Sequence, residues 1–412
     1  MPAATITLLE KMYKDVFKGS NPAMLAMRGK PGLSRVTKID DLEGHKSIYP
    51  IRVNLHTGVS HTFTDAQDND TVGDIYRFEI TAKNHYAVVN FDAKALAFAR
   101  SNVGSYLRLK AKETEEILEY AGQRMEKEFW RGTHVGSVTA APTNVSGSTY
   151  KVTLADPTDI INIHKGQVIE CWDTSDASSS TQRAEECTVT KINHADGTFE
   201  GTFTGNPTAW GTNTDYLFVE GDRTGSAILG WTGISQYIPA TAPSASDSFQ
   251  GVNRSNMPDY LAGWRGTEYG TIEETCQQLC TMMSPFVSAI DGKSEFWMHA
   301  KAFQKLQSEA GARLVRDQGG TPQLGYTKVR IATAMGDMAV NVGPFVPKSG
   351  VYLLDWSTIS LHTNKPLFHL VNEDGQEMLR KATADEFEMR WRSWSEVLVD
   401  EPVKNGYAPV TV

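Results

Sequence analysis

Hydrophobic and polar positions follow different periods in different parts of the chain. The strongest pattern is helical and runs from 102 to 132, where apolar side chains recur three and four positions apart and charged side chains fill the other faces. This pattern predicts an amphipathic helix, which would be ~45 Å long at ~1.5 Å per residue. Gly132 is suited to end it. A shorter amphipathic helix is predicted for residues 5–17.

Two alternating segments flank a long polar stretch near the N-terminal end. Apolar residues alternate loosely over 47–57 and more regularly over 75–91, and the sequence between them is GVSHTFTDAQDNDTVGD. Strands joined by so long a tip predict a projecting hairpin, which is marginally stable alone. Glycines and prolines interrupt the preceding residues 18–45, which we interpret as an extended arm. We therefore expect the arm and the hairpin to be ordered by a neighbouring protein.

Composition changes after the long helix. Residues 133–220 are rich in Thr, Ser, Gly, Asn and Asp and contain short β-type runs. These runs cover residues 150–154, 167–172, 187–192, 198–203 and 216–219. Asp196-Gly197, between two of the runs, is a strong hairpin signal. The segment is therefore predicted to be a small β-barrel or sandwich.

Helices and strands alternate in the last third of the chain. Thr271 and Glu274 have the spacing of a capping box, and Pro285 is expected to end the helix that they begin. A buried strand at Phe296 and Trp297 and a helix over 300–310 are predicted next. Short strands are predicted at 329–332, 338–342 and 351–354. This alternation predicts a compact α/β domain, and the apolar runs in 368–399 predict a closing sheet.

Composition narrows the class of protein. With 412 residues the chain is long enough for two to three domains, and its 40% hydrophobic content excludes general disorder. Its 49 acidic and 40 basic residues give a net charge of −9, which argues against a dedicated nucleic-acid binder. The four cysteines form no CxxC motif and indicate reduced thiols. The N-terminal residues carry acid and base in the first turns and no long apolar run, so we expect no signal peptide. No run of ~20 apolar residues indicates a membrane span.

Motifs of known enzyme and cofactor sites are missing from the sequence: GxSxG, HExxH, a Walker A loop and GxGxxG. We therefore expect no enzymatic activity and no cofactor. Asp68, Asp70, Gly73 and Glu79 match positions 1, 3, 6 and 12 of an EF-hand calcium loop, but Val72 offers no ligand at position 5. We interpret this region as an acidic, solvated tip, with Asp68, Asp70 and Glu79 as weak metal candidates.

Several longer stretches carry a family resemblance. They are EKEFWRG at the end of the long helix, VEGDRTGSAILGWTGISQYI after the β-rich segment, FQGVNRSNMPDYLAGW, and SWSEVLVDEPVKNGYAPV near the C-terminal end. Within them, Arg254, Ser255, Trp264, Pro402 and Asn405 match family positions. Taken with the order of the predicted elements, these stretches resemble the major capsid proteins of tailed bacteriophages, which have the Hong Kong 97-type fold.

The resemblance implies an α+β fold with an extended N-arm, an E-loop hairpin, a long spine helix, A- and P-domains and an all-β insertion domain. It implies the following division of the chain: 1–45, N-arm; 46–92, E-loop hairpin and start of the P-domain; 93–134, P-domain with the spine helix; 135–222, β-rich insertion domain; 223–267, return through the P-domain; 268–365, A-domain; 366–412, closing P-domain sheet and C-terminal tail.

The resemblance also implies a function and partners. The chain would be a major capsid protein that self-assembles into hexamers and pentamers of an icosahedral phage head, part of the virion, assembled in the bacterial host cytoplasm. Identical subunits, a portal, possible decoration proteins and non-specifically contacted double-stranded DNA are the implied partners, without a membrane. Because about forty residues precede the hairpin, we expect a separate scaffolding protein. Because no lysine lies between Lys46 and Lys83, we expect no lysine cross-link from the hairpin.

Residues expected at intersubunit contacts are Phe17, His56, Phe63, Arg77, Arg254 and Trp264. The alternatives are another phage structural protein, of the tail or decoration type, and an encapsulin-like compartment shell protein. A third is a carbohydrate-processing or carbohydrate-binding protein built on the β-rich segment, in which Trp172 and Trp210 stack on sugars.

Overall fold

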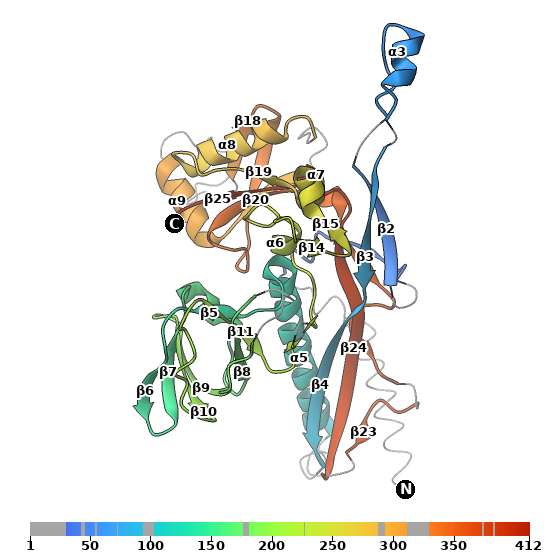
Figure 1. The fold of residues 1–412 in the computed structure, drawn as a ribbon. Helices are drawn as coiled ribbons and strands as arrows, with labels where there is room; N and C mark the ends of the chain where they lie inside the picture. Colours follow the sequence, from blue (N-terminus) through green and yellow to red (C-terminus); the bar gives the residue numbers. More distant parts are fainter. Residues whose placement is uncertain are drawn as a thin grey trace, which may run out of the picture. The chain divides into compact units, whose positions relative to one another are not determined.

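The computed structural model describes residues 30–42, 46–53, 56–71, 73–93, 103–175, 181–225, 227–286, 293–310, 329–372, 375–381 and 384–412. The chain divides into two compact units, Met1–Glu126 with Ile234–Val412, and Lys127–Gly233 (Figure 1). They are called the first and the second unit below. The helix predicted over 5–17 and the first part of the predicted arm lie outside the described residues.

A sheet built around one long strand supports the first unit. This strand, β24 (Glu386–Val399), pairs antiparallel with shorter strands on both of its edges. They are β4 (Lys83–Asp92), β21 (Ile359–Thr363), β22 (His369–Leu370) and β23 (Leu379–Arg380). β1 (Thr37–Ile39) extends the sheet parallel to β21. The closing sheet predicted from the apolar runs in 368–399 is confirmed.

The long helix is α5 (Val103–Arg131), within one residue of its predicted bounds. Gly132 ends it with φ +78°, and its N–H donates to the carbonyl of Glu128 at 2.8 Å. Glycine occupies this left-handed conformation without a Cβ penalty, so the predicted stop is confirmed.

The described part of the arm packs against its own chain, contrary to the expectation that a neighbour would order it. Leu33, Val36 and Leu42 are 1%, 6% and 2% exposed. The carboxylate of Glu126 on α5 is fully buried and accepts the N–H groups of Gly32 and Leu33 at 2.8 and 2.9 Å. The expectation was wrong for residues 30–42 because a buried carboxylate far along the chain supplies the missing hydrogen bonds.

A second sheet in the first unit forms the predicted α/β region. Its strands, in order, are β16 (Trp264–Arg265), β25 (Gly406–Pro409), β20 (Gly350–Asp355), β17 (Ser294–Met298), β19 (Gly336–Val342) and β18 (Val329–Thr333). α8 (Ile272–Met283) and α9 (Ala300–Ala310) bury their apolar faces in the same core. The capping box of Thr271 with Glu274 is present, and α8 ends before Pro285 as predicted. β25 was not predicted in this sheet.

The second unit holds an antiparallel sheet with a core of aliphatic, aromatic and cysteine side chains. Its strands, in order, are β5 (Gly136–Val138), β11 (Asp215–Val219), β8 (Val168–Trp172), β9 (Cys187–Asn193), β10 (Thr198–Phe203), β7 (Thr149–Thr153) and β6 (Thr143–Ser146). The predicted hairpin at Asp196-Gly197 joins β9 to β10. Trp172 and Trp210 are 4% and 0% exposed, so the idea that they stack on sugars is wrong.

Short elements with no hydrophobic periodicity complete the fold. They are β12 (Arg223–Thr224), β13 (Ala227–Ile228), α6 (Ile234–Tyr237), β14 (Ser248–Phe249), β15 (Val252–Asn253), α7 (Pro258–Ala262) and the 3₁₀ turns Pro157–Asn162, Arg254–Asn256, Trp356–Thr358 and Pro402–Lys404.

Candidate intersubunit surface

The predicted hairpin is present, and its base is anchored in the first unit. β2 (Lys46–Arg52) pairs antiparallel with β3 (Ile75–Thr81) from Lys46 opposite Thr81 to Arg52 opposite Ile75. On the inner face Phe78 is fully buried, with its ring 6.3 Å from that of Tyr237 and 6.0 Å from that of Phe249. The base of the hairpin is therefore ordered by its own chain, and only the part beyond it needs a partner.

A partly buried polar cluster connects the arm, the hairpin and β21. The Tyr49 hydroxyl lies 2.9 Å from an oxygen of Asp41 and 2.8 Å from His362 Nδ1, which is also 2.6 Å from the other Asp41 oxygen. Desolvation, together with Asp41, raises the pKa of Tyr49 well above its ordinary value, so the hydroxyl stays protonated and can donate. The cluster fixes the hairpin relative to the arm.

The same cluster has the order of groups found in a hydrolase triad, because Ser360 Oγ lies 2.8 Å from His362 Nε2. Ser360 and His362 are only 5% and 2% exposed, however. A substrate carbonyl needs access to the serine oxygen, which this packing denies. We therefore interpret the three groups as a structural junction.

The tip of the hairpin contains a helix that was not predicted, α3 (Phe63–Asp68). Thr62 caps it, accepting the N–H of Asp65. Thr57 closes the tip, with its hydroxyl 2.6 Å from the carbonyl of Asn69. Six residues are too few for a periodic signal to show in the sequence, which explains why the helix was missed.

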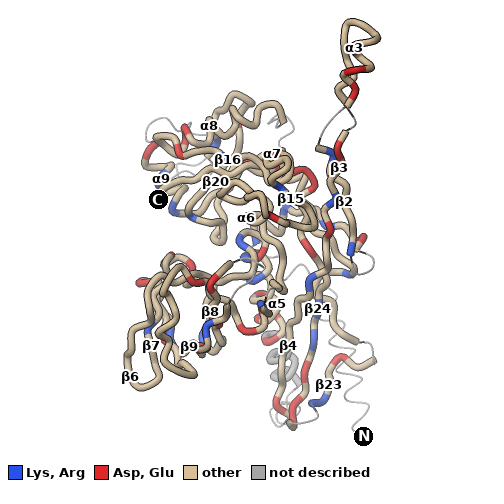
Figure 2. The backbone as a smooth tube through the Cα atoms, viewed as in Figure 1, with Lys and Arg blue, Asp and Glu red and all other residues tan. Residues whose placement is uncertain are grey.

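The tip exposes apolar side chains and carries a negative charge. No residue of α3 is buried, and Val59 and Phe63 are 84% and 79% exposed. Residues 56–74 contain four aspartates and no lysine or arginine. Figure 2 shows acidic and no basic segments at α3. An exposed aromatic ring at the end of a protruding element is typical of a surface that becomes buried in an assembly.

The EF-hand-like residues are not assembled into one site. Asp68 ends α3, Asp70 lies 3.3 Å from His56, and Glu79 in β3 pairs with Lys46 at 2.7 Å. Within the described residues no group of three or more His, Cys, Asp and Glu side chains is arranged to hold a metal ion. The strand flanking Glu79 explains the difference from an EF-hand, in which a helix follows the loop.

The expected contact residues fall into two classes. His56 and Phe63 lie exposed at the tip, and Arg77 lies exposed on β3. Arg254 is 6% exposed and is held in its own chain, where it pairs with Asp247 at 2.6 Å and lies 4.0 Å from the ring centre of Phe249. Sequence shows the residue type but not its burial, so this intrachain role was missed.

Trp264 is also engaged inside its chain, since its indole N–H donates to the carbonyl of Val403 at 2.8 Å. Phe17 lies outside the described residues. A contact with a neighbouring copy stays a prediction for all six residues. Among the helices of the described part of the chain, none is both long and apolar enough to cross a membrane.

Comparison with known proteins gives a match at the level of structure. No protein-family model matches the sequence, and no curated protein matches it either. A chain of the cyanophage A-1(L) capsid asymmetric unit matches over 92% of this chain and 92% of its own length, with a TM-score of 0.52 and 9% identity.

Two further matches have lower scores. A capsid chain of the native GTA particle covers 93% of this chain and 91% of its own, with a TM-score of 0.49 and 8% identity. The SrpI encapsulin of Synechococcus elongatus PCC 7942 covers 92% of this chain and 87% of its own, with a TM-score of 0.42 and 9% identity. The first match establishes the fold: this chain is folded like the capsid chain of cyanophage A-1(L).

Proposed function

We propose that this chain is the major capsid protein of a tailed bacteriophage and that identical copies assemble into a closed icosahedral shell. The observation that carries the proposal is the hairpin tip, on a chain that has a capsid protein's fold over nearly its whole length. The tip leaves Val59 and Phe63 almost fully exposed. A second copy of the chain is the natural surface to cover them.

The finer assignments belong to the same proposal. They are the Hong Kong 97-type fold, the domain division predicted from the sequence, assembly through hexamers and pentamers in the host cytoplasm, and enclosure of double-stranded DNA. A separate scaffolding protein, a portal and decoration proteins are the proposed partners. Heterologous contacts between copies give rings when the rotation from one copy to the next closes, and this proposal requires such a rotation.

An encapsulin-like shell is the second candidate, because it would use the same self-assembly. Particle contents separate the two: double-stranded DNA in particles from infected cells supports a phage head, whereas a packaged protein cargo supports a compartment.

Purified chains, viewed by negative-stain electron microscopy, test self-assembly. Rings or closed particles are expected, and chains that stay monomeric at all concentrations would contradict the proposal. Deleting residues 58–74 is expected to leave a folded subunit that does not assemble; shells of normal size from this variant would contradict the proposed role of the tip.

A point substitution gives a finer test. Phe63→Ser removes an exposed aromatic ring whose burial would contribute about 2 kcal/mol, so each contact is expected to weaken about 30-fold. Val145→Ser is the matched control, because Val145 is 53% exposed on β6 of the second unit and has no proposed contact. Equal assembly of both variants would show that the ring is not buried between copies.

A further inference from the structure

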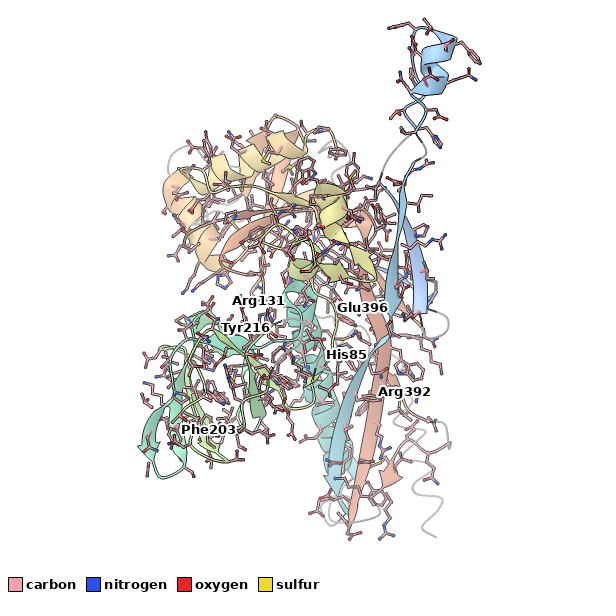
Figure 3. All side chains as sticks on the ribbon, in the orientation of Figure 1. His85, Arg131, Phe203, Tyr216, Arg392 and Glu396 are labelled. Carbon is pink, nitrogen blue, oxygen red and sulfur yellow. The ribbon has the colours of Figure 1, made fainter. Side chains whose placement is uncertain are left out.

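Asn405 and Gly406 form the only Asn-Gly pair in the sequence, and the fold buries both residues. The chain reaches them from β24, on which Figure 3 labels Glu396, through the 3₁₀ turn Pro402–Lys404. Gly406 begins β25, which lies between β16 and β20. In a flexible chain, Asn-Gly is the pair at which asparagine loses its amide most readily, because glycine leaves the next backbone nitrogen unhindered.

Asn405 is held by all parts of its amide group. Its Nδ2 donates to Thr358 Oγ1 at 2.9 Å and to the carbonyl oxygen of Glu401 at 3.1 Å. Its Oδ1 accepts the N–H of Asp355 at 2.9 Å. Thr358 Oγ1 gives its own hydrogen to the carbonyl of Asp355 at 2.8 Å, so it can only accept from Asn405. This position therefore needs two donors and one acceptor, which an amide supplies and a carboxylate does not.

Gly406 is held by the packing around it. A Cβ at this position would lie 2.5 Å from Met283 Sδ and 3.0 Å from Leu279 Cδ1. Both side chains are fully buried in one core and would have to move to admit a methyl group. The fold therefore calls for asparagine followed by glycine here, although this pair is the most labile one chemically.

Deamidation of such a pair proceeds through a cyclic imide. The backbone nitrogen of Gly406 loses its proton and attacks Asn405 Cγ, the bond from Cγ to Nδ2 breaks, and the amide nitrogen leaves as ammonia. Water then opens the imide and leaves either aspartate or isoaspartate. The net reaction consumes one water molecule and releases one ammonia, so it needs no oxidant or reductant.

The folded geometry opposes each step of this reaction. Asn405 has an extended backbone with φ −122° and ψ 151°, and ψ would have to rotate before the Gly406 nitrogen could reach Cγ. That rotation would break the 3.0 Å hydrogen bond from the Trp264 N–H to the carbonyl of Asn405. Asn405 is also 0% exposed, which keeps out the water that the reaction consumes. An unfolded chain has none of these restraints.

We propose that Asn405-Gly406 is a deamidation site that folding closes, so that chains which stay unfolded are modified and folded chains are not. An aspartate at 405 would lose both donors and would bury a negative charge against the carbonyl of Glu401. Isoaspartate would add a methylene to the backbone and displace β25 relative to β16 and β20. Deamidation therefore makes prolonged unfolding irreversible. The inference concerns the single chain and does not depend on assembly.

Peptide mass spectrometry of the full chain tests whether folding closes the site. One sample is kept in native buffer and another in guanidinium chloride, at the same mildly alkaline pH and temperature. Deamidation of Asn405 is expected to be at least about 100-fold slower in the native sample, because it requires local opening of β25. Asn206 is the internal control, since Pro207 has no N–H and cannot form the imide by this route. Equal rates at Asn405 in both samples would overturn the proposal.

Refolding tests the consequence of the modification. Guanidinium is diluted out of a partly deamidated sample, unfolded chains are digested by a protease, and the surviving chains are analysed at position 405. Survivors are expected to carry the unmodified asparagine, with deamidated chains depleted at least about 10-fold. Survival of modified and unmodified chains in equal proportion would show that the fold tolerates the product, and the proposal would fail.

A substitution made directly gives an independent measurement. Asn405→Asp is expected to lower the equilibrium constant for folding at least about 100-fold. Asn213→Asp is the matched control, because it makes the same chemical change at an exposed position of the second unit, and it is expected to stay within about 3-fold of the unaltered chain. Unchanged stability of Asn405→Asp would contradict the proposal. If this variant does not fold at all, the refolding comparison decides, because it starts from the unaltered chain.

Discussion

Glu126 offers the sharpest test of how the arm is held. Its carboxylate is fully buried, and its two oxygens accept the N–H groups of Gly32 and Leu33 at 2.8 and 2.9 Å. Glu126→Gln keeps the shape of the side chain but replaces one acceptor oxygen by an NH₂ group. One of the two backbone N–H groups then faces a donor and loses its hydrogen bond.

The size of the effect follows from these contacts. A hydrogen bond to a charged group contributes about 1.5–3 kcal/mol, and the second bond becomes a weaker, neutral one. We therefore expect Glu126→Gln to lower the free energy of unfolding by about 2–3 kcal/mol. An effect confined to release of the arm would instead raise local opening of residues 32–36 by about 30- to 150-fold.

Hydrogen–deuterium exchange and urea denaturation of unassembled chains measure the two effects. Glu115→Gln is the matched control, since Glu115 lies on the same helix, is exposed, and is expected to change stability by less than about 0.5 kcal/mol. Unchanged exchange at Gly32 and Leu33, together with an unchanged denaturation midpoint, would refute the assignment of Glu126 as the anchor of the arm.

Two further outcomes follow from buried polar groups. The fully buried side chain of Asn405 makes three hydrogen bonds, at 2.9, 2.9 and 3.1 Å. Asn405→Ala is therefore expected to lower the free energy of unfolding, measured by urea denaturation, by about 3–4 kcal/mol. The control Asn364→Ala, which removes one hydrogen bond of an exposed side chain, is expected to lower it by less than about 1 kcal/mol. Burial and two nearby cations lower the pKa of His134 from 6.5 to about 3, so the unfolded state binds a proton that the folded state does not. The second unit therefore loses stability as pH falls from 6.5 toward 3, and hydrogen exchange should show a shallower slope in His134→Gln. Part of the slope should remain, because burial also lowers the pKa of His164 in the same unit.

The sequence predicted the elements whose signals are long or local. α5 was predicted because its periodicity extends over 29 residues, and α8 because the Thr271 and Glu274 capping box is a local pattern. Five of the seven strands in the large sheet of the second unit were predicted from short β-type runs and one turn signal, whereas β5 and β6 were missed. These features depend on neighbours in sequence, which a single chain displays directly.

The features that were missed depend on partners far away in the sequence. Glu126 and Gly32 are 94 positions apart, and Tyr49 and His362 are 313 apart, so neither contact leaves a local pattern. β25 gains its place in a sheet only through β16 and β20. The candidate site was predicted in outline, as a polar hairpin tip, but the anchoring of the hairpin's base by Tyr237 and Phe249 depends on contacts that are distant in the sequence.

The fourteen-residue β24 also limits how this chain can change over generations. From Met389 to Ser393 its side chains alternate between the core and the outer face, as Trp391, 2% exposed, and exposed Arg390 show. Adding or losing a single residue just before Arg390 would turn every later side chain to the opposite face and would bring Arg390 and Arg392 into the core. Descendants of this chain can therefore vary in length in the connecting loops, whereas the length of β24 should stay constant.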